Sequence, residues 1–371
     1  MICGGYFNNI NYALGNVVWP VVPSFFFSQL TFCGQFLFAR SGAPLWVIYL
    51  VHVASMAGML LVTLWMIRVT HPWAGDLRPC VMDLRRTREL ARTSVWVYFC
   101  SLGSLVYLTT DRLVINGVLG AAELPTYYFN YKLCELAMTF LGSAAYVSLP
   151  GILVRLASHD PKERQHGMTG TLRLQRLQVF FGCLAAGAYL VVNNFFISLW
   201  LGPAFLVPLS LQIAFALNLA ITISGEVGVH LLGRLDESGL RVAGVTIAGT
   251  AVLNLCLSLL AAHSGSLLGV AAATLVAQSF ASVIMGAATC HRLSLSHPRW
   301  TVRTWVLPTL AVGLMAAARV MLEPTSLFSA VALSGAIGLV LVALAGAIGL
   351  RFYMFIEEWQ RLRVSFRVNA T

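Results

Sequence analysis

Five ionisable residues lie inside long apolar stretches of the chain, where ionised side chains are rare: Asp111, Arg112, Lys132, Glu135 and Glu226. An unpaired charge at the centre of a bilayer costs roughly 2.5 to 3.5 kcal/mol or more, so such residues face a protein interior or a water-filled cavity. Inside a membrane they mark the paths of substrates or ions by default. The chemistry open to these side chains is therefore the binding of charged groups and the carriage of a cation.

Polar residues recur at helical spacing around these charges and form a stripe on each of four predicted helices. The stripes comprise Cys100, Ser104, Tyr107 and Asp111; Tyr128, Lys132, Glu135, Thr139, Ser143 and Tyr146; Asn218, Thr222, Glu226 and His230; and Thr274, Gln278 and Ser282. Residues three or four apart share one face of a helix, so the stripes predict a hydrated path between the helices. For isolated Ser and Thr residues, hydrogen bonds that hold helices together are the simpler interpretation. The candidate cavity or substrate-binding residues are Asp111, Arg112, Tyr128, Lys132, Glu135 and Glu226.

The composition requires lipid as the solvent for most of the surface. Of the 371 residues, 58% are hydrophobic and only 10% are charged, against roughly 25% charged in an ordinary soluble domain. The net charge of +10 does not come from one basic patch, so nucleic acid is not an expected partner. The eight cysteines include no C-x-x-C pair, and neither a disulfide framework nor a metal site is expected.

Ten stretches are long and apolar enough to cross a membrane, which takes about 20 residues as a helix. They lie near residues 10–36, 44–67, 94–118, 125–152, 178–200, 205–231, 241–262, 266–290, 303–322 and 327–350. Only helices or closed barrels satisfy their backbone groups in lipid, and barrel strands would be about half this length. The sequence therefore predicts an all-α integral membrane protein of about ten transmembrane helices.

Basic residues are distributed unevenly between the two sides of the membrane that this count implies. One side has only two basic residues, Arg40 and Arg319. The opposite side has Arg68, Arg78, Arg85, Arg86, Arg88, Arg92, Arg155, Lys162, Arg164, Arg173, Arg176, Arg234, Arg241, Arg292, Arg299, Arg303, Arg351, Arg361, Arg363 and Arg367. The positive-inside rule makes the basic side cytoplasmic, with both termini there. We expect a multi-pass protein of the cytoplasmic (inner) membrane, with polar cytoplasmic connectors at 69–93 and 153–177.

Signatures of familiar enzymes are absent from the sequence. It contains no glycine-rich phosphate loop, no H-E-x-x-H pair and no G-x-S-x-G elbow. The predicted outward-facing connectors are only a few residues long, which leaves no domain for catalysis on the outer face. The sequence therefore indicates neither an enzyme nor a cofactor.

Several short segments follow one another in a characteristic order and spacing. They are 110–115 (TDRLVI), 119–123 (LGAAE), 127–128 (YY), 149–151 (LPG), 199–203 (LWLGP), 231–234 (LLGR), 253–258 (LNLCLS) and 269–275 (GVAAATL). In this order they resemble segments of polysaccharide-unit (Wzx-type) flippases, which belong to the multidrug, oligosaccharidyl-lipid and polysaccharide exporter superfamily. The likeness covers roughly residues 7–293.

The resemblance implies two bundles of six helices around a central cavity, followed by two extra helices. Only two helices precede the second bundle here, so this chain looks N-terminally truncated by about four helices and would form a partial two-bundle exporter fold. The expected parts are a remnant of the first bundle at 1–68, a basic linker at 69–93, the second bundle at 94–292, two extra helices at 293–350 and a basic tail at 351–371.

By the same resemblance, the substrate is an oligosaccharide repeat unit on a polyprenyl diphosphate, as in O-antigen and other surface polysaccharide biosynthesis. Arg112 and Lys132 would attract the diphosphate or acidic sugars, and Asp111, Glu135 or Glu226 would couple the cycle to a cation. The implied partners are this lipid-linked oligosaccharide, membrane lipids, and polymerase or glycosyltransferases of the same pathway. The alternatives are a multidrug cation antiporter of the same superfamily and, from another class, a membrane-embedded polysaccharide-processing enzyme or a non-transporting fragment.

Depth in the membrane suggests which charges pair. Asp111 and Lys132 lie on consecutive antiparallel helices, each about seven residues from the outer turn near 119–124, which puts both roughly 10 Å below the surface. Opposite charges at one depth should pair, because either alone would be desolvated. We expect an ion pair between Asp111 and Lys132, with Arg112 and Glu135 as further members. Glu135 is one turn from Lys132 and could compete for it.

The predicted topology can be tested by cysteine labelling in a cysteine-free background. Single cysteines at Ala122 and Ser264 should react with an impermeant reagent added outside intact cells, whereas cysteines at Ser158 and Ser296 should react only after lysis. Labelling of the second pair in intact cells would contradict the orientation.

Overall fold

The computed structural model describes residues 26–27, 30–31, 33–35, 37–38, 40–70, 84–322 and 327–349, and every regular element in these ranges is a helix. The chain divides into two compact units, Met1–Arg88 and Glu89–Thr371. The boundary lies within the expected linker at 69–93. The first expected span, 10–36, and the basic tail at 351–371 lie outside these ranges, apart from a few residues near the end of the span.

In the first unit, helix α3 (Leu45–Thr70) is the longest described element. Its stretch Tyr49–Met66 is apolar over 18 residues, and Arg68 lies in its last turn. A basic residue at this end is favourable for the helix dipole.

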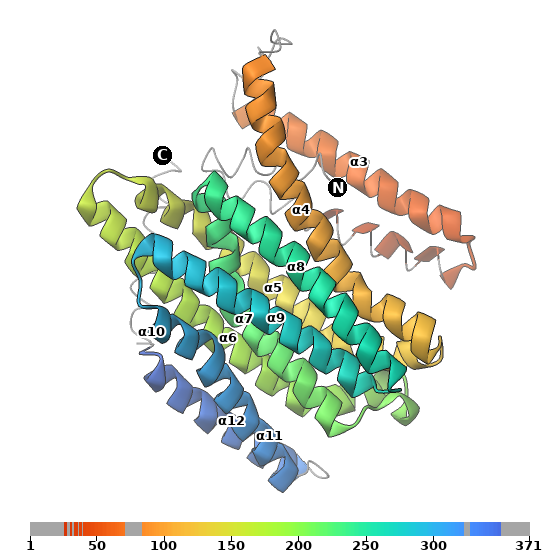
Figure 1. Ribbon diagram of the computed structural model, residues 1–371. Helices are drawn as coiled ribbons and strands as arrows, with labels where there is room; N and C mark the ends of the chain where they lie inside the picture. Colours follow the sequence, from red (N-terminus) through yellow and green to blue (C-terminus); the bar gives the residue numbers. More distant parts are fainter. Residues whose placement is uncertain are drawn as a thin grey trace. The chain divides into compact units, whose positions relative to one another are not determined.

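The second unit contains the six long helices that correspond to the predicted second bundle (Figure 1). Their bounds are α4 (Leu84–Val114), α5 (Glu123–Ala157), α6 (Pro161–Trp200), α7 (Leu209–Leu235), α8 (Glu237–His263) and α9 (Leu267–Leu293). A π-helix, η2 (Ile115–Leu119), continues α4, and a short 3₁₀ helix, η3 (Pro203–Phe205), lies in the connection from α6 to α7.

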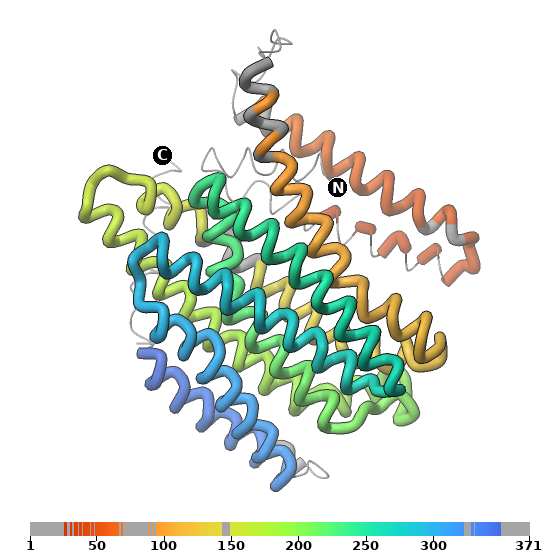
Figure 2. Tube along the Cα trace, in the orientation of Figure 1, coloured from red at the N-terminus to blue at the C-terminus, as the bar shows by residue number. Residues whose placement is uncertain are grey.

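The last helices of the described chain pack on one flank of this bundle (Figure 2). They are α10 (His297–Thr301), the π-helix η4 (Val302–Val306), α11 (Leu307–Leu322) and α12 (Leu327–Ala347). Helix α11 contacts α6 and α7, and α12 contacts α6 and α11. Buried Leu333 and Ile337 of α12 therefore belong to the same hydrophobic core as residues of α6 and α7.

Length and composition make this an all-α membrane protein. Six described helices can cross a membrane: Tyr49–Met66 within α3, Pro161–Trp200, Leu209–Leu235, Glu237–His263, Leu267–Leu293 and His297–Leu322. A shorter apolar helix spans Val331–Ala347. Helices α4 and α5 are 31 and 35 residues long and are not among these six. Described helices thus occupy all the predicted spans except the first.

The two long polar stretches differ from the sequence prediction of connectors. Helix α4 already begins at Leu84, inside the expected linker 69–93, and only 158–160 separate α5 from α6, where the connector 153–177 was expected. Asp160 caps α6 by accepting a hydrogen bond from the Lys162 amide at 2.9 Å, and Pro161 occupies the first helical position. Polar residues here extend helices beyond the apolar spans, because a helix needs an apolar surface only where lipid surrounds it.

Helix α7 lies at the centre of the second unit and contacts α5, α6, α8, α9 and α11. Its residues Phe215, Leu219 and Ile223 are almost fully buried. A helix that is apolar around its whole circumference is buried inside a protein, and α7 fits this pattern. Three polar residues of α7, namely Thr222, Glu226 and His230, line the cavity described below.

Helices α4 and α8 approach closely through glycine. A Cβ atom added to buried Gly103 would lie 2.9 Å from Ile247 Cγ2 and 3.1 Å from the Ala248 amide nitrogen. One added to Gly244 would lie 3.2 Å from the Trp96 ring. Small residues let membrane helices pack backbone against side chain, so Gly103 sets the spacing of α4 and α8.

The change Gly103→Ala should lower the stability of the protein by about 1 to 3 kcal/mol, because α8 backbone must move to admit the methyl group. Thermal unfolding in detergent measures this loss. Gly249→Ala, at an exposed position of α8, is the control, because nothing lies within 4 Å of the added atom. An unchanged melting temperature for Gly103→Ala would contradict the close packing.

Candidate functional site

The carboxylate of Asp111 is buried at the end of α4, only 9% exposed, and accepts hydrogen bonds from three other helices. The Tyr127 hydroxyl of α5 lies 2.7 Å from Oδ2. From α8, Asn254 Nδ2 and Ser258 Oγ lie 3.3 and 3.5 Å from Oδ1. From α9, Thr274 Oγ1 lies 2.9 and 2.8 Å from the two oxygens. Neutral donors thus surround the carboxylate, an arrangement we call the Asp111 network.

Local sequence explains how these donors reach one point. Asn254 and Ser258 are four residues apart and so share one face of α8. The Ser258 hydroxyl also lies 3.3 Å from Asn254 Oδ1, and Thr274 Oγ1 lies 3.1 Å from the same oxygen. The π-helix η2 begins four residues after Asp111, and single π-helical turns are frequent at functional sites. The sequence analysis placed Thr274 on a polar stripe but did not identify the four donors as partners of Asp111.

The predicted ion pair between Asp111 and Lys132 is wrong. The Asp111 carboxylate accepts hydrogen bonds from the neutral donors named above, while Lys132 Nζ lies 2.9 Å from Glu135 Oε2. The prediction compared only the depth of the two residues along their helices. Successive residues of a helix are about 100° apart around its axis, so Asp111 and Arg112 point to different sides, and Lys132 lies on the side of Arg112.

Glu135 is the shared anion of a second group, which comprises Arg112, Tyr128, Lys132 and Glu135. The Glu135 Oε2 atom lies 3.1 Å from Arg112 Nη2 and 2.9 Å from Lys132 Nζ. Both cations also lie over the Tyr128 ring, with Arg112 Cζ 4.5 Å and Lys132 Nζ 5.4 Å from its centroid. The ion-paired side chains are 37%, 33% and 28% exposed for Arg112, Lys132 and Glu135. The group carries one net positive charge on an accessible surface between α4 and α5.

A cavity of about 390 Å³ opens among α4, α5, α7, α8 and α9. Its polar lining comes largely from the predicted stripes: Ser104, Tyr107, Thr139, Thr222, Glu226, His230 and Gln278. Tyr131, Met138, Thr250 and Met285 add aromatic, aliphatic and hydroxyl surface. Of the six candidate residues, Glu226 lines this cavity. Asp111 lies one helical turn beyond Tyr107 of its wall.

The Glu226 carboxylate contacts Nε2 of His230, one helical turn away on α7. Two side chains from other helices bond to the backbone of α7 directly after Glu226. Gln178 Oε1 accepts from the Val227 amide at 3.0 Å, and Thr289 Oγ1 donates to the Gly228 carbonyl at 3.2 Å. Gln178 and Thr289, which the sequence analysis missed, thus hold the segment that carries Glu226.

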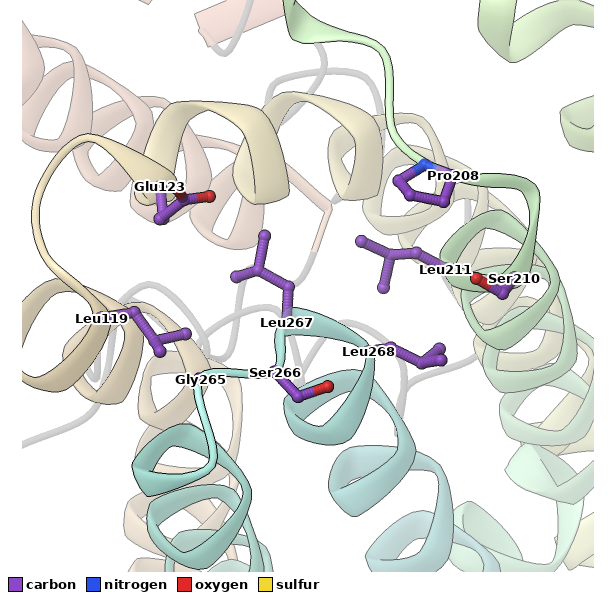
Figure 3. A pocket seen from close by; sticks show the side chains of 9 residues that line it. All are labelled: Leu119, Glu123, Pro208, Ser210, Leu211, Gly265, Ser266, Leu267 and Leu268. Carbon is purple, nitrogen blue, oxygen red and sulfur yellow. The ribbon is translucent and has the colours of Figure 1, made fainter.

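A second pocket, of about 520 Å³, lies at the end of the bundle where α5, α7 and α9 begin (Figure 3). Leu119, Leu211, Leu267 and Leu268 give it an apolar lining, and Glu123 lies at the first residue of α5. A carboxylate at the start of a helix is favourable for the helix dipole. The position of Glu123, the charged residue of this pocket, is therefore explained by its place in the helix.

Metal-binding chemistry has no obvious centre in the part of the chain that the structure describes. Within it, no group of three or more His, Cys, Asp or Glu side chains is placed to hold a metal ion. The free cysteines of this part lie apart, among them buried Cys134, Cys183 and Cys290. The polar chemistry of the described helices is therefore that of the Asp111 network, the Glu135 group and the cavity.

Fold and site together define a multi-pass helical membrane protein with ionisable residues in its interior. The chain is similar to the uncharacterized membrane protein EpsK of Bacillus subtilis (strain 168), with 23% identity over 169 residues. The match covers 46% of this chain and 33% of EpsK, so it spans about a third of the length of that protein. No protein-family model matches the chain. No solved structure matches it either.

Glu135→Gln should destabilise the protein more than Arg112→Gln or Lys132→Gln, because it leaves two neighbouring cations without their shared anion. Each single cation change should cost about 0 to 1 kcal/mol and the Glu135 change about twice as much, because partly exposed pairs contribute little individually. Melting temperatures of the three variants in detergent measure the order.

The exchange of Asp111→Lys with Lys132→Asp serves as the contrasting variant. It should be no more stable than Asp111→Lys alone, because the two side chains lie on different faces of α4 and α5. Recovery of stability by the exchange would contradict the observed placement.

Proposed function

We propose that this chain acts as a flippase, or as part of one, for oligosaccharide repeat units linked to polyprenyl diphosphate in the cytoplasmic membrane. The observation that carries the proposal is the cavity of about 390 Å³ that opens among five helices of a membrane bundle and is lined by Glu226, His230 and Gln278. Polar groups inside a membrane bundle are costly unless a function retains them. The sequence resemblance to Wzx-type flippases supplies the substrate class.

The lining of the cavity suits the sugar portion of such a substrate. Thr222, Thr250 and Gln278 offer hydroxyl and amide groups, and Tyr107 and Tyr131 offer aromatic rings. The Thr250 hydroxyl is buried and lacks a hydrogen-bond partner in the described part of the chain. An unpaired polar group inside a protein destabilises the folded state. A ligand that forms the missing hydrogen bond therefore gains affinity.

The Glu135 group suits the anionic end of the substrate. Its guanidinium and ammonium groups are both held by one carboxylate oxygen and one aromatic ring, which fixes their positions. One positive charge remains for an incoming diphosphate. An arginine fork binds phosphate oxygens in pairs, and Arg112 is half-exposed for this contact.

The Asp111 network suits a coupling cation or proton. The carboxylate faces hydroxyl and amide groups of Tyr127, Asn254, Ser258 and Thr274 and no cationic side chain of the described residues. Such a carboxylate can hold a proton or a small cation, because both restore neutrality without a salt bridge. Because four helices meet at Asp111, a change in its charge state would alter their packing.

A multidrug cation antiporter is the second candidate. In the sequence, Arg112 and Lys132 stand close to the acids, which argues mildly against this candidate. The structure instead separates two carboxylates from these cations, since Asp111 bonds to neutral donors and Glu226 pairs with His230. Acids free of Lys and Arg partners are what a cation substrate requires.

On either proposal the chain is not an enzyme and uses no cofactor. For the flippase, the partners are the lipid-linked oligosaccharide, membrane lipids and the polymerase or glycosyltransferases of the same pathway, and nucleic acid has no part. Both termini lie in the cytoplasm in this proposal, as the distribution of basic residues indicates.

Transport can be tested with the purified chain in vesicles that contain a fluorescent polyprenyl-diphosphate oligosaccharide. Wild-type protein should expose inner-leaflet label to an impermeant quencher at a rate that depends on a sodium or proton gradient. Asp111→Asn should lower this rate at least about tenfold, because a neutral amide cannot exchange a cation and tenfold corresponds to about 1.4 kcal/mol. Glu123→Gln, outside the cavity, is the matched control and should transport normally.

Other results distinguish the candidates. Efflux of ethidium without movement of the lipid would replace the flippase with the antiporter. Movement of neither substrate would contradict transport by this chain, and equal rates for Asp111→Asn and wild type would remove Asp111 from coupling.

A further inference from the structure

Buried hydrogen bonds fasten α6 to the start of the last helices. Gln175 is fully buried in α6, and its Nε2 atom donates to Thr304 Oγ1 at 3.0 Å and to the Trp300 carbonyl at 3.5 Å. Thr304 and Trp300 are themselves 1% and 2% exposed. These contacts place residues 175, 300 and 304 at one level of the bundle.

Three arginines directly adjoin these residues: Arg176, Arg299 and Arg303. Arg299 and Arg303 are four apart along the continuous turn from α10 into η4 and so share one side. The charges of Arg176 and Arg299 both act on the Arg303 guanidinium. Arg176 Nη1 donates to the Gly349 carbonyl at 3.3 Å, while its Nε is buried without a partner in the described chain. We call this set the arginine cluster.

The arginine cluster lacks the carboxylates that neutralise other basic residues of the second unit. Arg92 and Arg241 both pair with Glu237, Arg155 with Glu163, and Arg292 with Asp236. No ion pair with a described Asp or Glu includes a member of the cluster. Three like charges brought together by the fold repel one another, so an anion bound among them would stabilise this end of the bundle.

The depth of the cluster matches the headgroup region of a membrane. Residues 303–322 are 20 long, which is about the number that crosses the hydrocarbon core, so Arg303 lies at its edge and Arg299 just outside. Trp305 lies two residues from Arg303 in the sequence, and tryptophan is enriched at membrane interfaces. The anion that is concentrated at this depth is the phosphate of an anionic lipid.

We propose that the arginine cluster is a binding site for the phosphate group of an anionic phospholipid. Guanidinium groups bind phosphate oxygens in bidentate pairs, and three of them from α6, α10 and η4 surround one headgroup. The lipid would link α6 to the end of α12, because Arg176 also holds Gly349. Basic pockets between membrane helices at a cytoplasmic end are a recurring form of lipid site. This site is independent of the cavity and of any transported substrate.

The test measures lipid binding to the purified full chain by native mass spectrometry and by thermal unfolding in neutral detergent. Phosphatidylglycerol should remain bound and raise the melting temperature of the wild type, whereas phosphatidylcholine should not. The variant Arg176→Gln/Arg299→Gln/Arg303→Gln should lose this effect, with affinity about fivefold weaker for each guanidinium removed. The matched control, Arg155→Gln/Lys162→Gln/Arg164→Gln, removes the same charge near the α5–α6 turn and should bind lipid as the wild type does.

Three results would overturn the proposal. The two triple variants could bind phosphatidylglycerol equally, or inorganic phosphate could stabilise the wild type as well as the lipid does. Phosphatidylglycerol could also leave the melting temperature of the wild type unchanged. Should the triple variant fail to fold, the single variant Arg299→Gln tests the proposal. Arg299 is exposed and tolerates replacement, and its loss should still weaken lipid binding about fivefold.

Discussion

A carboxylate inside a membrane bundle must be compensated, and the compensation of Asp111 determines how four helices meet. Tyr127, Asn254, Ser258 and Thr274 reach it from α5, α8 and α9. None of these side chains carries a positive charge, so the site holds its charge only through oriented dipoles. In the proposed transport cycle, a small cation or proton neutralises this site, and the packing of α4 against α8 and α9 depends on that event.

The neighbouring residue shows the opposite solution. Arg112 turns away from the Asp111 network and shares the Glu135 carboxylate with Lys132 over the face of Tyr128. This group is half-exposed and keeps one net positive charge, whereas Asp111 is buried. Adjacent residues of α4 thus lie in two different environments. Asp111 is a buried acid among neutral donors, whereas Arg112 belongs to a partly exposed cationic group.

Sequence patterns predicted much of the fold because lipid imposes a simple rule on length and hydrophobicity. The spans from α3 to α12 follow from it, and the helical spacing of polar residues identified most of the polar wall of the cavity, including Glu226 and Gln278. Polar stretches at 84–93 and 161–177 were not recognised as helical, because the rule describes only residues in contact with lipid.

The pairing of charges could not be predicted by the same means. Depth along a helix is readable from the chain, but direction around the axis of two packed helices is not, so Asp111 and Lys132 seemed to face each other. The hydrogen bonds of Gln178 and Thr289 to the α7 backbone could not be predicted either, because a single Gln or Thr in an apolar helix does not reveal its partner. Such details depend on tertiary packing.

Infrared difference spectroscopy of the purified chain tests most directly whether the Asp111 carboxylate changes its charge state inside the folded protein. The measurement follows the carbonyl band of protonated carboxylic acids as pH is lowered at low sodium. Wild type and Glu226→Gln should both gain a band that Asp111→Asn lacks. Identical difference spectra for wild type and Asp111→Asn would contradict the proposed change of charge state.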